Sequence, residues 1–332
     1  MTIDAGTQRR PLGSGGLTVF PIALGCMGMS GMYGPVDERE SIATIHAALD
    51  AGVSVLDTGD FYGTGHNEML IGRAIRDRRD QAVLSVKFGA LRGPDGNWLG
   101  YDARPVAVKN SLAHSLTRLG VEYIDIYRPA RLDPMVPIED TVSAITSQVQ
   151  AGYVRAIGLS EVGPETIRRA QQVQPIVDLQ IEYSLMSRGP EEKIFPTLRE
   201  LGIGVTAYGV LSRGLLSGST PTGPYDLRAH LPRFTGEHLE RNRRLAAALR
   251  ALAGERGVSP AQMAIAWVLA KDPRIVPVVG ARTRAQLADA LGALRIELSP
   301  GDLTRLEAAV PASAVAGSRY SDVQMRMLDS ER

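Results

Sequence analysis

Short runs of apolar, often β-branched residues alternate with longer segments of helical periodicity along this chain. A strand, a helix and a second strand in succession favour parallel pairing of the two strands. Eight repeats of this unit suit a closed (β/α)8 barrel better than an open doubly wound sheet. The pattern therefore predicts an α/β fold of the TIM-barrel type, with strands at 21–25, 53–57, 83–87, 123–127, 155–159, 177–181, 204–208 and 275–279.

The segments between these runs carry the start and stop signals of helices. In 37–51, apolar residues recur at helical spacing, and Glu40 follows Asp37 by three positions, as in a capping box. Gly52 stands where a C-terminal cap is expected. A second segment, 105–120, opens with proline and closes with glycine, which are the residues favoured at those two ends. The other predicted helices cover 65–78, 138–151, 164–173, 191–201, 237–256, 259–271 and 283–293.

A glycine-rich segment precedes the first repeat. Residues 9–20 have Gly13, Gly15 and Gly16 between two leucines, a pattern typical of a β-hairpin. Such a hairpin is in a position to plug the bottom of the barrel. Composition alone does not divide the chain, so we expect residues 1–332 to form a single barrel domain.

The charge balance excludes several classes of partner. The 332 residues include 37 Lys and Arg against 36 Asp and Glu, which leaves no broad basic field for nucleic acid or anionic lipid.

Cys26 is the single cysteine, so no disulfide forms within the chain. The first residues lack the layout of a signal peptide, and the apolar runs are shorter than a membrane span requires. We predict a cytoplasmic protein without a membrane segment.

Several chemical motifs are missing from the sequence. No G-x-G-x-x-G pattern is complete; the glycine pairs 13/15 and 63/65, for example, have Thr18 and Glu68 at the sixth position, so a Rossmann nucleotide site is unsupported. The Walker and H-E-x-x-H patterns are also absent. The five histidines show no ligand spacing with the cysteine, so we predict no metal.

A dense polar cluster follows the second predicted strand. Asp57 ends this strand, and a carboxylate in a barrel mouth is costly unless a cation meets it. Lys87, which ends the next strand, is the natural cation. On spacing alone the pair is equally well explained as a structural ion pair. Tyr62 favours function, because a lysine cation beside a phenol lowers the pKa of the phenol and lets it protonate an oxygen while a hydride arrives at carbon.

At these residues the chain resembles the aldo-keto reductases. The resemblance extends over almost the whole sequence and implies a barrel that binds NADPH across its C-terminal mouth without a Rossmann motif. It also implies reduction of a small aldehyde or ketone to an alcohol by hydride transfer. The segments that match the family in order and spacing are 24–29, 56–58, 62–63, 67–68, Lys87, 157–160, 179–183, 207–214 and 279–282.

The resemblance also assigns roles to individual residues. It makes Tyr62 the proton donor, Lys87 the cation that lowers its pKa, and Asp57 the carboxylate that holds the lysine. Arg282 matches an arginine whose guanidinium binds the 2′-phosphate with two hydrogen bonds, which favours NADPH over NADH. Ser160 and Gln180 match positions that bind the nicotinamide carboxamide, Tyr208 matches the aromatic residue on which the ring stacks, and the other implied cofactor contacts are Met27, Gly28, Asp57, Gly209, Leu211, Arg213, Gly280 and Gln286.

One departure from the family pattern affects the chemistry. The family usually has a histidine at the end of the fourth strand, and Ala130 stands in its place. Losing such a hydrogen-bond donor commonly costs about 10²–10³ in rate. Three accounts remain open: Tyr62 acts with a bound water, Arg128 supplies the donor, or the protein is an NADPH-binding redox-sensing or regulatory subunit with weak catalysis. Two further departures are Glu161 and Ala290, each where the family often has asparagine.

Substrate choice is expected to depend on the loops 30–36, 89–103 and 217–234. Their neighbourhood offers Tyr33, Phe61 and Trp98 as apolar walls of a pocket, although each is equally well explained as a packing residue. Arg128 is a further candidate for contact with the carbonyl substrate. The stretch after residue 311 either lies across the mouth or forms a loose tail.

Overall fold

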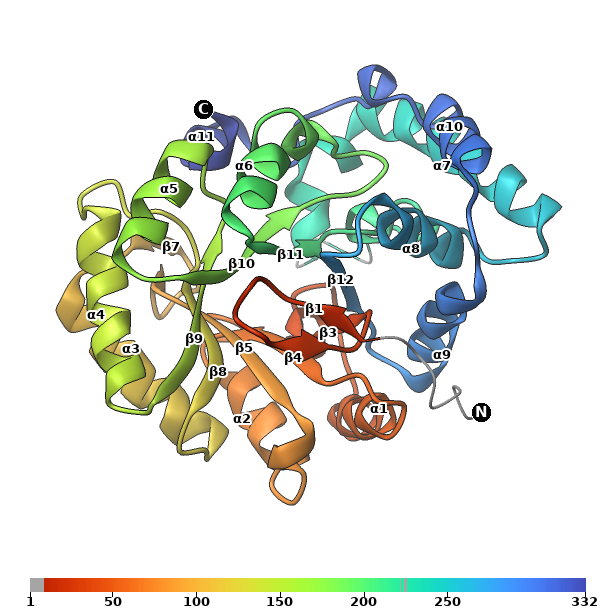
Figure 1. Ribbon diagram of the computed structural model, residues 1–332. Coiled ribbons are helices and arrows are strands. Elements are labelled where there is room, and N and C mark those ends of the chain that lie inside the picture. The colour runs from red at the N-terminus through yellow and green to blue at the C-terminus, as the bar shows by residue number, and fades with distance from the viewer. Residues whose placement is uncertain (1–8, 222, 224–225) are drawn as a thin grey trace.

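Eight parallel strands close into a barrel in this computed structural model, which describes residues 9–221, 223 and 226–332 (Figure 1). Going round the barrel, the strands follow chain order, and β12 pairs with β3 to close it. The predicted (β/α)8 fold is confirmed. The barrel strands are β3 (Ala23–Gly25), β4 (Val55–Gly59), β5 (Val83–Phe88), β8 (Ile124–Pro129), β9 (Val154–Ser160), β10 (Ile176–Glu182), β11 (Gly204–Tyr208) and β12 (Ile275–Gly280).

Helices surround the barrel, and their bounds follow the sequence signals closely (Figure 1). Asp37 caps the first helix by accepting hydrogen bonds from the backbone N–H groups of Arg39 and Glu40. The predicted capping box is wrong in its second half, because the Glu40 carboxylate pairs with Arg284 instead. The helices are α1 (Glu38–Asp50), α2 (His66–Ala74), α3 (Pro105–Leu119), α4 (Ile138–Gln150), α5 (Pro164–Val173), α6 (Ile194–Leu201), α7 (Gly236–Glu255), α8 (Pro260–Lys271), α9 (Arg284–Gly292), α10 (Pro300–Ala309) and α11 (Asp322–Arg326).

The predicted N-terminal hairpin is present and closes one end of the barrel. It consists of β1 (Arg10–Pro11) and β2 (Thr18–Val19), and its Leu12 and Val19 pack in one buried cluster with barrel residues. Gly13 has φ +70°, and a Cβ there would lie 2.2 Å from the carbonyl oxygen of Val177. Only glycine permits this approach, so the turn fixes how deeply the hairpin sits.

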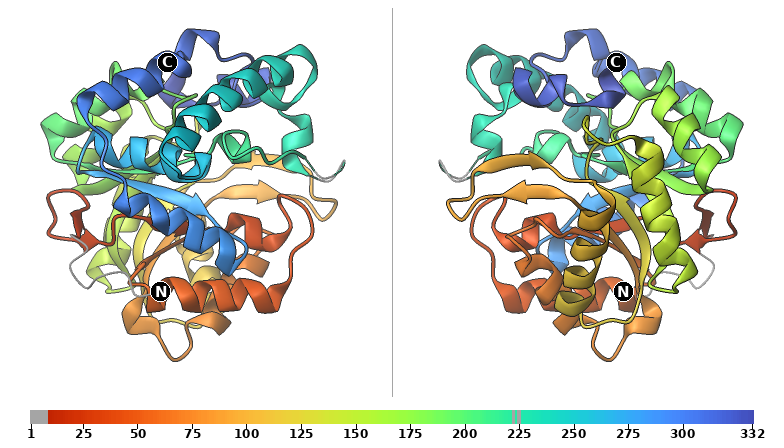
Figure 2. Two further views of the ribbon diagram at one scale, coloured as in Figure 1. Left: turned by 90° about the vertical axis from the view of Figure 1, so that its right-hand side faces the viewer. Right: turned by 90° about the vertical axis from the view of Figure 1, so that its left-hand side faces the viewer.

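A second hairpin stands at the opposite end of the molecule. Figure 2 shows it projecting away from β1–β2. It is formed by β6 (Ala90–Arg92) and β7 (Trp98–Tyr101), within a segment that the sequence analysis treats as a loop. The helices α10 and α11 were also not predicted. None of the helices formed by the described residues is both long enough and apolar enough to span a bilayer.

Candidate active site

Asp57 and Lys87 form a buried ion pair between β4 and β5. Lys87 is next to the end of β5, but Asp57 is in the middle of β4, which continues to Gly59, so the expectation that Asp57 ends its strand is wrong. The Lys87 Nζ donates to Asp57 Oδ1 over 2.6 Å, and both side chains are at most 6% exposed. The other carboxylate oxygen, Oδ2, accepts from Ser85 Oγ at 3.0 Å and from Gln180 Nε2 at 2.6 Å. Since a buried charge is stable only where its hydrogen bonds are satisfied, this network explains how the barrel holds the pair.

Tyr62 lies against this pair on the turn that follows β4. The turn is held to the next strand because the Asp60 N–H donates to the Lys87 carbonyl oxygen at 2.9 Å. The Lys87 Nζ lies 5.1 Å from the centroid of the Tyr62 ring, and Phe61 meets the ring edge to face at 4.7 Å between centroids. The structure thus brings the three predicted catalytic residues together.

The expected lowering of the Tyr62 pKa is not found. Burial raises the pKa of this phenol well above its usual range, the Asp57 carboxylate raises it further, and Arg131 opposes both. Burial also lowers the pKa of Lys87, although Asp57 works in the other direction. The physical reason is that desolvation of a phenolate outweighs the attraction of a lysine that is already compensated by Asp57. Tyr62 is therefore a neutral phenol, the form that donates a proton.

Asp60, on the same turn, carries a pH dependence of stability. Its Oδ2 accepts from the Gly89 N–H, but its buried Oδ1 has no partner among the described residues, and burial raises the pKa of the carboxyl to about 7. Because this exceeds the unfolded value of about 3.9, the folded state binds the proton more tightly, and stability falls as pH rises from about 4 to 7. We expect Asp60→Asn to raise the free energy of unfolding by about 1–3 kcal/mol at pH 8 and little at pH 4. Urea unfolding at both pH values tests this, and an equal gain at both would contradict it.

Arg128 lies inside the barrel and not at its open mouth. Its side chain is fully buried and donates to Asp178 Oδ2 at 2.9 Å, to Thr206 Oγ1 and to Ser85 Oγ. Gly158 leaves space for it, since a Cβ there would lie 2.9 Å from the guanidinium carbon. These partners do not support the hypothesis that Arg128 donates to a substrate at the Ala130 position. They fit a role in filling and neutralising the barrel interior.

The predicted cofactor residues Gly280, Arg282 and Gln286 lie beside the loop after β3, which carries two further predicted cofactor residues. Met27 and Gly28 lie in a short 3-10 helix there, and a Cβ on Gly28 would lie 3.3 Å from the Arg282 side chain. The Arg282 guanidinium donates to the carbonyl oxygen of Tyr33 at 3.1 Å, and its backbone N–H donates to Gln286 Oε1. Gly280 ends β12 just before them. Gly28 and Arg282, both predicted from the sequence as cofactor contacts, therefore meet in space although about 250 positions separate this loop from Arg282.

Tyr208, the predicted nicotinamide-stacking residue, and further predicted cofactor contacts lie at the end of β11, the strand that pairs with β12. Tyr208 ends β11 and donates from its hydroxyl to Glu161 Oε1 at 2.7 Å. The following turn, from Gly209 through Leu211 to Arg213, includes left-handed backbone at Gly209 and Arg213, with φ values of +66° and +54°. The Arg213 guanidinium pairs with Glu182 at 3.0 Å. This pairing holds the turn over the ends of β10 and β11.

The C-terminal segment, residues 319–331, lies across the mouth and is no loose tail. Arg319 forms a buried ion pair with Glu161 at 2.6 Å, and Ser330 also donates to that carboxylate. The hydroxyl of Tyr320 lies 2.9 Å from that of Tyr208. Although burial works against it, Arg319 holds the pKa of Glu161 well below its usual range. Sequence reasoning missed Arg319 and Tyr320, because no pattern marks a contact made from so far along the chain.

The three predicted aromatic walls have different surroundings. Phe61 packs on Tyr62, as described above. The Tyr33 ring lies under the Arg228 guanidinium at 5.4 Å. Trp98 lies on β7, where it meets Tyr101 edge to face at 4.6 Å. Phe61 packs directly on a predicted catalytic residue, and pocket contact by all three stays a prediction.

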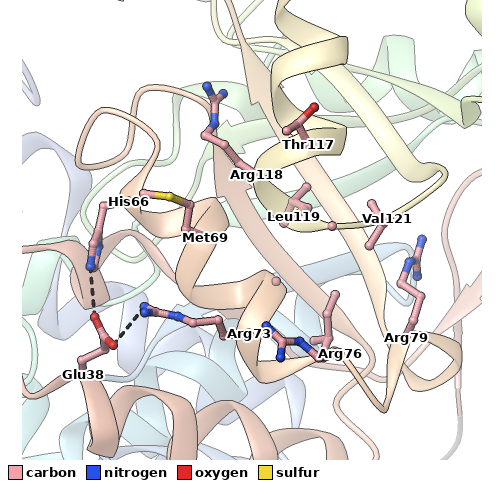
Figure 3. A pocket seen from close by; sticks show the side chains of 13 residues that line it. Glu38, His66, Met69, Arg73, Arg76, Arg79, Thr117, Arg118, Leu119 and Val121 are labelled. Carbon is pink, nitrogen blue, oxygen red and sulfur yellow. Dashed lines mark hydrogen bonds and ion pairs between the residues drawn. The ribbon is translucent and has the colours of Figure 1, made fainter.

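A pocket of about 410 Å³ lies outside the barrel, between α2 and α3 (Figure 3). Arg73 and His66 point toward Glu38 at one edge, and Arg118, on the opposite wall, pairs with the buried Glu68. None of the predicted site residues lines this pocket. The described residues contain no cluster of His, Cys, Asp and Glu arranged to hold a metal ion. The candidate chemistry is therefore that of the barrel mouth.

Comparison with known proteins agrees with this geometry. The profile of the Aldo/keto reductase family matches residues 21–311. A probable aldo-keto reductase 1 of Glycine max is 41% identical over 326 residues, which cover 96% of this chain and 93% of that protein. A solved glycerol dehydrogenase from Gluconobacter oxydans has a TM-score of 0.82 at 28% identity, covering 92% of this chain and 97% of its own. An aldo-keto reductase from Bacillus halodurans, in its holo form, has a TM-score of 0.76 at 27% identity, with the same coverage.

Proposed function

This chain belongs to the aldo/keto reductase family, and on that premise we propose that it reduces an aldehyde or ketone to an alcohol with NADPH, using Tyr62 as the proton donor. The observation that carries the proposal is the buried Asp57–Lys87 pair with the neutral Tyr62 phenol against it. A general acid needs a proton to give and a fixed position. Burial keeps the proton on Tyr62, and the hydrogen bonds of the turn fix the position of its side chain.

The side chains at the mouth fit a nicotinamide dinucleotide. Ser160 and Gln180 offer a hydroxyl and an amide suited to a carboxamide, and Tyr208 offers a ring at the end of β11. When bound, the cofactor supplies the hydride. Arg213 and Arg282 are guanidinium groups of the kind that bind phosphate, and Arg282 would hold a 2′-phosphate, which favours NADPH over NADH.

In the proposed reaction Tyr62 gives its proton to the carbonyl oxygen as the carbonyl carbon accepts the hydride. Lys87 lies over the Tyr62 ring and stabilises the phenolate that this transfer leaves behind. Asp57 keeps Lys87 charged and in place, and Ser85 and Gln180 hold Asp57. The Tyr62 phenolate then recovers a proton from water.

A second candidate function follows from Ala130. This residue is 2% exposed and has no polar side-chain atom to orient a carbonyl oxygen. The C-terminal segment also places Tyr320 against Tyr208. A redox-sensing or regulatory subunit that binds NADPH and turns over slowly fits both observations.

The test is the loss of reduced-nicotinamide absorbance with purified protein, NADPH and a panel of aldehydes, ketones and quinones. NADPH carrying deuterium on the transferred position is used in parallel. We expect oxidation that depends on substrate, with deuterium found on the carbinol carbon of the product. If NADPH binds but no panel member is reduced above background, the reductase proposal fails and the regulatory alternative is favoured.

A further inference from the structure

Arg131 differs from Arg213 and Arg319, two other arginines of the mouth, in donating hydrogen bonds only to neutral acceptors. Its guanidinium donates to the Ala130 carbonyl oxygen at 2.6 Å, to Ser160 Oγ at 3.3 Å and to the Tyr320 hydroxyl at 3.1 Å. Arg213 and Arg319 each pair with a buried carboxylate. Arg131 forms no ion pair within 4.0 Å with any carboxylate in the part of the chain that the structure describes. Burial lowers the pKa of Arg131, whereas neighbouring tyrosines and the Glu161 carboxylate raise it without forming an ion pair with it. A guanidinium with no direct ion pair is suited to receive negative charge from a ligand.

Arg131 lies at the barrel mouth, beside residues that the family resemblance assigns to the cofactor site. The residue follows Ala130 just after β8, and its hydrogen bonds reach Ser160 at the end of β9 and Tyr320 in the C-terminal segment. These three contacts use three of the five N–H donors of a guanidinium. Two donors thus remain for an oxygen of a bound molecule.

Arg131 is also a cation that acts on the Tyr62 phenol. Burial and the Asp57 carboxylate raise the pKa of Tyr62, whereas Arg131 lowers it. The other nearby cation, Lys87, has its charge compensated by Asp57 at 2.6 Å. Arg128 is paired with Asp178 inside the barrel. Arg131 is therefore a positive charge that acts on the predicted proton donor and has no direct ion-pair partner among the described residues.

We propose that Arg131 is a catalytic residue that performs the task lost at Ala130, with its guanidinium donating to the carbonyl oxygen of the substrate. The inference rests on the proposed reductase function. As a hydride adds to the carbonyl carbon, the π electron pair moves to oxygen, and the oxygen takes the proton of Tyr62. Arg131 keeps its own protons throughout and stabilises the negative charge that develops on oxygen. The products are an alcohol and oxidised NADP⁺.

The test compares Arg131→Gln and Arg131→Lys with the wild-type protein on a carbonyl substrate that the panel identifies. We expect Arg131→Gln to lower kcat by about 10²–10³-fold, with the KM and the NADPH dissociation constant changed by no more than about threefold. Arg131→Lys keeps the charge and is expected to retain part of the lost rate. In Arg131→Gln the alkaline limb of the kcat profile moves to higher pH, because a cation near Tyr62 has been removed. NADPH binding is measured by fluorescence, independently of turnover.

A double variant separates this role from a structural one. Ala130→His in the Arg131→Gln background restores a donor from the neighbouring position, and we expect it to recover at least about tenfold of the lost kcat. Arg168→Gln, which removes an exposed arginine paired with Glu200, is the matched control and is expected to leave kcat unchanged.

Three results would overturn the proposal. The first is an Arg131→Gln kcat close to that of wild type. The second is a rise in KM alone, confined to substrates that bear a carboxylate, which would make Arg131 a binding residue only. The third is loss of NADPH binding or of folding that neither Arg131→Lys nor Ala130→His repairs. Absence of turnover in the wild-type protein would instead overturn the reductase proposal, and this inference with it.

Discussion

Tyr62→Phe is expected to lower kcat by about 10²–10⁴-fold, the range that a positioned general acid contributes. The substitution removes one oxygen and keeps the ring, so the edge-to-face contact with Phe61 and the approach of Lys87 to the ring persist. NADPH affinity is therefore expected to change by no more than about threefold. Steady-state kinetics on a panel substrate, with fluorescence titration of NADPH, measures both quantities.

Another buried tyrosine provides the control for Tyr62→Phe. Tyr127 is fully buried, stacks on Phe88 at 4.4 Å, and donates to the Val108 carbonyl oxygen outside the site. Tyr127→Phe also removes one buried hydroxyl, so it reproduces the structural cost without touching the reaction. We expect it to lower stability by about 1 kcal/mol and to leave kcat within about twofold. Equal losses of kcat in the two variants would remove Tyr62 from the mechanism.

Most of the barrel could be predicted from the sequence because its strands are local patterns. Each strand is a short apolar run bounded by polar or glycine residues, and this is the signal that periodicity detects. The hairpin β6–β7 was not predicted because its strand Trp98–Tyr101 shows no alternation of buried and exposed residues and is half-buried. The helix α11 was not predicted because five residues are too few to show a helical period. Elements held mainly by tertiary contact leave no such pattern.

The contacts of the candidate site likewise fall into those that the sequence predicts and those that only the folded chain shows. Asp57 and Lys87 lie on neighbouring parallel strands, so their pairing follows from the fold. Arg128 stands near the end of the fourth strand, which suggested a substrate contact, but its side chain pairs with Asp178 inside the barrel, and the sequence does not show which face of the strand it occupies. The pairing of Glu161 with Arg319 joins residues 158 positions apart, and only the folded chain brings them together.

Lys87→Met is expected to be the most damaging single substitution, because it affects both stability and chemistry. Removing one partner of a buried ion pair typically costs about 3–5 kcal/mol, since the other charge stays buried without compensation. Ser85 and Gln180 still donate to Asp57, so the lower end of this range is expected. Turnover is expected to fall by about 10²–10⁴-fold, because the Tyr62 phenolate loses the cation above its ring. Guanidinium chloride unfolding and steady-state kinetics give the two effects.

The double variant Lys87→Met/Asp57→Asn separates these effects. Asn at position 57 is neutral and keeps an oxygen for the hydrogen bonds from Ser85 and Gln180, so no buried charge remains uncompensated. Because a buried pair replaced as a whole by neutral groups often costs little, most of the lost stability is expected to return. Turnover is not expected to return, since the cation over Tyr62 is still missing. Recovery of both stability and turnover would mean that Asp57 and Lys87 serve the fold alone. Recovery of neither stability nor turnover would mean that the barrel mouth requires the two charges to hold its shape.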